Sequence, residues 1–176
     1  MALQISITLP CKPYVAHYLR TKFGSPCQLY RGSAEGKMLF NLLDRASHER
    51  DTAAGKYSDS VEILLSEGMY LRNGWELTPT AVQQYNTWLE EMLKERFSIH
   101  VDALLGFGIK KSIAIRHFQY QQNFPEHVWK YETLKKYHDR STTNRAPIDP
   151  EEIAKMVHVS DAKRYPYRKH FDPRQN

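Results

Sequence analysis

Residues 78–105 read TPTAVQQYNTWLEEMLKERFSIHVDALL, and this stretch is the strongest helix signal in the chain. Thr78 is a suitable N-cap residue and Pro79 a suitable first helical residue. From Val82 onward, apolar residues recur every three or four positions, as they do along one face of an amphipathic helix. The Gly-Phe-Gly that follows interrupts the pattern. The sequence therefore predicts one long helix that ends at about Leu105 and serves both halves of the chain.

Residues 1–76, which precede this helix, predict a small α/β domain. Apolar and polar residues alternate over 3–9, as in a half-buried strand, whereas 61–65 is apolar on both sides, as in a central strand. Helices are expected after Pro13 and after Ser33. Between them, residues 27–31 form a short run bounded by breakers, which predicts a third strand.

Residues 67–75 (EGMYLRNGW) allow two structures. They fit a helical turn, the preferred interpretation, or a returning fourth strand, because Asn73-Gly74 is a turn signal. The expected fold class is therefore α+β, with a small three-stranded or four-stranded sheet and packed helices, followed by the long helix and a helical hairpin. Residues 77–140 form the expected helical domain.

The charge bias of the chain lies after residue 106. Residues 1–106 hold 11 Lys and Arg against 12 Asp and Glu, a net charge of −1. Residues 107–140 hold 7 against 3, a net of +4, and residues 141–176 hold 7 against 5, a net of +2. Cationic side chains provide most of the contacts to phosphates, so this distribution points to a polyanion partner.

Residues 110–140 predict a basic pair of helices resembling a helix-turn-helix, which inserts its second helix into the major groove of DNA. Base contacts are expected from Gln122 and Thr133. The expected phosphate contacts come from Lys110, Lys111, Lys130, Lys135, Lys136 and Arg140. The connector is longer than the usual tight turn and lacks its glycine, and Trp129 is expected to pack inward. An ordinary helix pair with a lysine-rich solvated face remains an alternative.

Residues 141–176 predict a basic and mostly irregular tail, compatible with one short helix over 150–157. Near the end, aromatic residues alternate with the cations Lys163, Arg164, Arg168 and Lys169. Single-stranded nucleic-acid binders combine rings and cations in this way. The alternative is an arm that docks on its own protein or on a neighbouring subunit.

The sequence offers no signature of catalysis, metal binding or membrane insertion. It has two cysteines, expected to be free thiols, and eight histidines without metal-ligand spacing. It lacks phosphate-binding glycine loops and nucleophile elbows, and no apolar run approaches the ~18 residues of a membrane span. We therefore expect a cytoplasmic protein that is not an enzyme and that requires no cofactor and no metal.

Three segments carry a family resemblance: KPYVAHYLRTKFGSP (12–26), VEILLSEGMYLRNGWELT (61–78) and IAIRHFQYQQNFPEHVWKYETLKKYHDR (113–140). They resemble a loose group of uncharacterised small proteins of Bacteroidetes phages and mobile elements. The resemblance implies an accessory role with a helix-turn-helix-like C-terminal unit, and it supplies no catalytic residues. The tail lies outside it.

Together these patterns predict an accessory or regulatory protein that binds double-stranded DNA, with residues 1–76 as a scaffold or oligomerisation surface. One alternative is a protein adaptor or phage assembly component that docks on itself or on another mobile-element protein through its tail. A further alternative is an RNA-binding accessory protein, because charge alone does not separate DNA from RNA.

Overall fold

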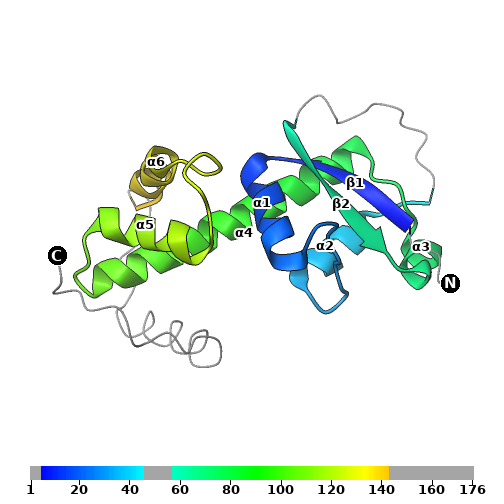
Figure 1. Ribbon diagram of the computed structural model, residues 1–176, viewed down its shortest axis with the longest axis horizontal. Coiled ribbons are helices and arrows are strands. Elements are labelled where there is room, and N and C mark those ends of the chain that lie inside the picture. Colours follow the sequence, from blue (N-terminus) through cyan, green and yellow to red (C-terminus); the bar gives the residue numbers. More distant parts are fainter. Residues whose placement is uncertain (1–4, 46–56, 143–176) are drawn as a thin grey trace.

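The computed structural model describes residues 5–45 and 57–142, and this part of the chain is 61% helical, with six helices and a two-stranded antiparallel sheet. The elements are β1 (Ile5–Cys11), α1 (Pro13–Phe23), α2 (Ala34–Leu42), β2 (Asp59–Leu65), α3 (Glu67–Asn73), α4 (Pro79–Gly106), α5 (Lys111–Gln121) and α6 (Tyr131–Thr142). The two strands and α1 to α3 surround one half of α4, and α5 and α6 lie at its other end (Figure 1).

The expected α+β fold with a sheet of three or four strands is wrong, because the described residues are mainly helical and form a two-stranded sheet. β1 and β2 pair from Ile5 opposite Leu65 to Cys11 opposite Asp59, but the predicted strand over 27–31 contributes only an isolated parallel bridge between Cys27 and Ile63. The chain then leaves the sheet, because the carbonyl of Tyr30 accepts a hydrogen bond from the Ser33 amide in a turn that leads into α2.

A fourth strand over 67–75 is also wrong, and the preferred helical interpretation is confirmed. Ser66 caps α3 by accepting a hydrogen bond from the Met69 amide. Gly74, with φ of 92°, ends it. A Cβ atom at Gly74 would lie 2.1 Å from the carbonyl oxygen of Asp44, so only glycine permits this close approach. The approach lets Asp44 pair with Glu76 and closes the segment against α2.

The long helix α4 begins and ends close to its predicted limits. Thr78 Oγ1 accepts a hydrogen bond from the Ala81 amide, and Pro79 is the first helical residue. The first half of α4 packs against β1 and α2, where Asn86 Nδ2 donates to the Pro10 carbonyl at 2.9 Å. The second half packs against α5. The expectation that this helix serves both halves of the chain is therefore confirmed.

An aromatic cluster holds the α5–α6 unit to the rest of the protein. Trp129, in the connector between those helices, is buried and stacks on Tyr14 of α1 with ring centroids 4.7 Å apart. Phe97 of α4, Phe118 of α5 and Phe124 of the connector surround the same indole ring. The inward orientation predicted for Trp129 is confirmed, and it fixes the connector against α1.

The two cysteines are free and buried, as expected. Burial raises the pKa of Cys11 to about 12, so its thiol is not a nucleophile at neutral pH. None of the helices in residues 5–45 and 57–142 combines the length and the apolarity needed to cross a membrane.

Candidate nucleic-acid interface

Helices α5 and α6 run antiparallel, and contacts at both ends hold them together. At one end, Lys111 of α5 forms an ion pair with Asp139 of α6. Toward the other end, the guanidinium of Arg116 lies 5.1 Å from the ring centroid of Tyr131. Below them, Leu134 and His138 are the buried residues of α6, and His138 Nε2 lies 2.8 Å from Asp102 Oδ1 of α4.

The connector between the two helices makes its turn without glycine. Asn123 has φ of 53°, a left-handed conformation that asparagine tolerates better than most residues. The carboxylate of Glu126 accepts hydrogen bonds from the Tyr131 amide at the start of α6 (2.8 Å) and from Gln119 Nε2 (3.2 Å). The sequence Asn-Phe-Pro-Glu therefore provides both the turn and the support for the second helix.

The buried face of α5 differs from the predicted one. The spacing of apolar residues along this helix predicts that Ile113 and Tyr120 face inward, but they are 47% and 87% exposed. The buried residues are Ala114, Ile115, Phe118 and Gln119. Gln119 can lie inside because its Nε2 donates a 2.7 Å hydrogen bond to the Trp129 carbonyl. A polar residue with a buried partner thus takes a position that hydrophobic periodicity assigns to an apolar one.

The exposed side of α6 divides into two strips. Successive residues are 100° apart around a helix, so residues three and seven positions apart share a strip. The first strip consists of Thr133, Lys136 and Arg140, all exposed and none acidic, and is called the cationic strip below. The second consists of Glu132, Lys135 and Asp139 and carries both signs of charge. The cationic strip therefore suits an anionic ligand better, because no carboxylate on it would repel the anion.

The predicted phosphate-binding residues do not form a single face. Lys110 is exposed at the N-cap of α5. The neighbouring Lys111 is paired with Asp139, and Lys135 also lies close enough to that carboxylate to help lower its pKa, after the larger effect of the Lys111 hydrogen bond. Lys130 is exposed just before α6, and its charge helps to lower the pKa of Glu126, after the larger effect of the hydrogen bond from the Tyr131 amide.

The remaining residues predicted to contact nucleic acid are Gln122 and four cations of the tail. Gln122 is half-buried at the C-terminal end of α5, where its backbone N–H donates a hydrogen bond to the Phe118 carbonyl. The four tail cations, Lys163, Arg164, Arg168 and Lys169, fall outside the described residues.

Two histidines meet between α4 and α5. His100 and His117 stack with ring centroids 5.1 Å apart, and His100 Nε2 lies 3.0 Å from His117 Nδ1. Burial, with a smaller effect from His117, lowers the pKa of His100 to about 4, so this imidazole is neutral at physiological pH. Within residues 5–45 and 57–142, no group of three His, Cys, Asp or Glu side chains is placed to hold a metal ion.

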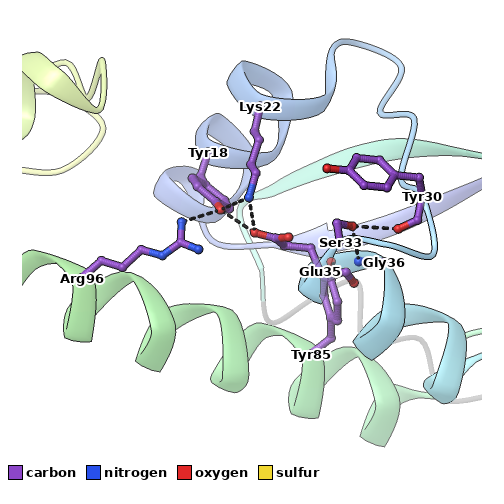
Figure 2. A network of polar contacts seen from close by, with 8 residues as sticks. All are labelled: Tyr18, Lys22, Tyr30, Ser33, Glu35, Gly36, Tyr85 and Arg96. Atoms are coloured by element: carbon purple, nitrogen blue, oxygen red, sulfur yellow. Dashed lines mark hydrogen bonds and ion pairs between the residues drawn. The ribbon is translucent and has the colours of Figure 1, made fainter. Parts of the chain in front are cut away.

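A second polar cluster joins α1, α2 and α4 (Figure 2). Glu35 of α2 is only 1% exposed, and its Oε1 accepts hydrogen bonds from the Tyr18 hydroxyl at 2.5 Å and from Lys22 Nζ at 2.7 Å. Arg96 of α4 donates to the Tyr18 hydroxyl at 3.0 Å, and Tyr85 donates to the Glu35 carbonyl at 3.2 Å. No local sequence pattern predicts this cluster, because its members come from three separate helices.

The charges and hydrogen bonds of this cluster stabilise the fold. Burial by itself would raise the pKa of Glu35, but hydrogen bonds from Lys22 and Tyr18 lower it below its usual range. The carboxylate is therefore ionised and paired with an ammonium, and the Tyr18 hydroxyl both donates and accepts. With its donors and acceptors directed at one another, the cluster crosslinks three helices.

Comparisons of the chain with protein-family models, with curated proteins and with solved structures found no match.

Proposed function

We propose that this chain is a non-enzymatic, cytoplasmic DNA-binding accessory or regulatory protein of a phage or mobile element, and that α6 is the helix that contacts the duplex. The observation that carries the proposal is the cationic strip: Thr133, Lys136 and Arg140 lie on one exposed side of α6 with no acidic residue among them. The phage or mobile-element context rests on the resemblance of the three sequence segments alone.

The dimensions of α6 suit a duplex groove. From Thr133 to Arg140 the helix rises by about 10 Å, at 1.5 Å per residue, and a major groove about 12 Å wide admits an α-helix. Thr133 lies near the N-terminus of α6, where the recognition helix of a helix-turn-helix contacts base edges. Lys136 and Arg140 are assigned to phosphates, with Lys130 as a further contact beside the helix start.

The position of α6 also supports this role. Its buried side rests on α4 and α5 through Leu134 and His138, and its N-terminus is held by Glu126. The helix is therefore presented on a fixed base, which reduces the entropy lost on binding. Residues 107–142 carry 7 positive and 3 negative side chains, so the whole unit attracts a polyanion.

Binding of a labelled duplex by the full chain, followed by fluorescence anisotropy at about 50 mM and about 200 mM salt, tests the proposal. Three phosphate contacts predict an affinity that falls about 40-fold between these conditions, because log K changes by about 0.9 per contact for each decade of salt. Single-stranded DNA and RNA of the same length serve as competitors. No binding at low salt, salt-independent binding, or displacement of the duplex by single-stranded RNA would each overturn the proposal.

A further inference from the structure

The outward face of α5 is apolar and basic, and the DNA-binding proposal does not use it. Ile113 and Tyr120 are seven residues apart and so lie on one line along the helix, with Arg116 beside them. Exposed Phe107 lies in the turn that leads into α5. We call Ile113, Arg116 and Tyr120 the α5 outer face. Large side chains of this kind gathered at the surface mark an interaction site.

We propose that the α5 outer face binds residues 149–159 of the same chain, whose sequence is DPEEIAKMVHV. This segment lies outside the described residues. Three of its apolar residues, Ile153, Met156 and Val157, have the spacing of one helical face. Acidic residues come just before them, at Asp149, Glu151 and Glu152. The segment thus offers apolar groups for Ile113 and Tyr120 and negative charge for Arg116.

Charge complementarity selects this occupant. Residues 107–121 contain Lys110, Lys111 and Arg116 and no Asp or Glu. Lys111 is paired with Asp139, whereas Lys110 and Arg116 are exposed. Two copies of the α5 outer face packed against each other would therefore bring Arg116 of each copy together, with no acidic residue on that face. The segment 149–159 carries three acidic residues and one lysine, a net of −2, and so has the opposite sign.

The segment is also within reach. Helix α6 ends at Thr142, and Asp139 in its last turn contacts Lys111 in the first turn of α5. Residues 143–148 join Thr142 to the segment, and six residues span up to about 20 Å. Helix α5, with 11 residues, is about 16 Å long. A tether this short keeps the local concentration of the segment in the millimolar range, so a weak contact is sufficient to hold it.

Hydrogen exchange of the full-length chain, read by mass spectrometry, tests this inference. Amides of residues 150–159 are expected to exchange at least about tenfold more slowly than in a denatured reference, which corresponds to about 1.4 kcal/mol of docking free energy. The protection should disappear in the variant Ile113→Asp/Tyr120→Asp, and equally in Ile153→Asp/Met156→Asp. Both residues of the first pair are exposed, so their replacement leaves the core intact.

The matched control is Leu71→Asp on α3, which replaces a 60% exposed apolar residue in the other half of the protein and should leave the protection unchanged. Unprotected amides in the unmodified chain, or protection that survives Ile113→Asp/Tyr120→Asp, would overturn the inference. Protection that grows with protein concentration would assign the α5 outer face to a second copy instead. Loss of duplex affinity in that variant, with exchange unchanged, would assign it to nucleic acid.

Discussion

Lys111, in the first turn of α5, forms an ion pair with Asp139, in the last turn of α6. This pair locks the two helices at one end, and it also places a carboxylate among the residues that the sequence assigns to phosphate. Lys135 lies near the same carboxylate, whereas Lys136 and Arg140 lie on the other exposed strip of α6. The structure thus separates cations that the protein already uses from cations directed at solvent.

Asp139→Asn is expected to strengthen duplex binding. The substitution removes a negative charge beside Lys111 and Lys135 and keeps the shape of the side chain. Exposed charge interactions are weak and screened by salt, so the affinity at low salt should rise by no more than about fivefold. Glu62→Gln makes the same charge change at an exposed position of β2 and should have no such effect. Equal gains in both variants would show that net charge alone, not the α6 surface, governs binding.

Glu35→Gln is expected to lower the free energy of unfolding by about 1–3 kcal/mol at pH 7, because it leaves Lys22 without its buried partner. Chemical denaturation monitored by circular dichroism measures the change. The exposed Glu62→Gln again serves as the control, and its effect should lie within about 0.5 kcal/mol of zero.

The difference between the unmodified chain and Glu35→Gln should depend on pH. The folded protein holds the pKa of Glu35 below the ordinary value of 4.5, so the stabilisation is fully present above pH 4.5. It is lost as pH falls through the folded pKa, and the two proteins should then converge in stability. A difference that stays constant from pH 7 down to pH 3 would contradict this account of the cluster.

Replacing two helical glycines by alanine should change the stability of the protein in opposite directions. At Gly36 in α2, a Cβ atom would lie 2.2 Å from the Tyr30 carbonyl oxygen, so Gly36→Ala should destabilise the fold by about 2 kcal/mol or more. At Gly68 in α3, no atom lies within 4 Å of the same position. Gly68→Ala should therefore stabilise by about 0.5–1 kcal/mol through helix propensity. Thermal unfolding of both variants measures the two changes in stability. Changes of the same sign would contradict the packing described for the two positions.

The His100–His117 pair predicts a loss of stability in mild acid. Because the folded pKa of His100 is about 4 and its ordinary value is 6.5, the unfolded chain binds a proton first as pH falls. Stability should decline between pH 6.5 and 4, by about 3 kcal/mol from this residue, because each unit of pKa shift corresponds to about 1.4 kcal/mol. In His100→Gln the decline should be smaller by that amount, and in the exposed control His127→Gln it should be unchanged. Identical pH profiles for all three proteins would exclude the pair as the cause.

The sequence predicts those features whose signals are local. The limits of α4 follow from its cap, its proline and its regular apolar stripe, all within the helix itself. The inward position of Trp129 follows from the size of its ring beside a proline turn. By contrast, the third strand needed a partner along its whole length, and the sheet offers residues 27–31 a single bridge.

The candidate interface was predictable only in part, for a related reason. The exposure of Thr133, Lys136 and Arg140 follows from the periodicity of α6. The orientation of α5 does not follow, because isoleucine occurs at both 113 and 115 and because Gln119 finds a hydrogen-bond acceptor in the Trp129 carbonyl, a distant contact. The Lys111–Asp139 pair and the Glu35 cluster likewise join residues that are far apart in sequence.

The most direct test of the central claim is the salt dependence of duplex binding by Lys136→Gln/Arg140→Gln. Its charge-matched control is Lys37→Gln/Arg72→Gln, which removes two exposed cations from α2 and α3. If Lys136 and Arg140 contact phosphates, the slope of log K against log salt should become shallower by about 1.8, at 0.9 per contact, and the control slope should not change. Equal slopes for the unmodified chain and the α6 variant, or an equal change in the control, would contradict the claim that α6 holds the duplex.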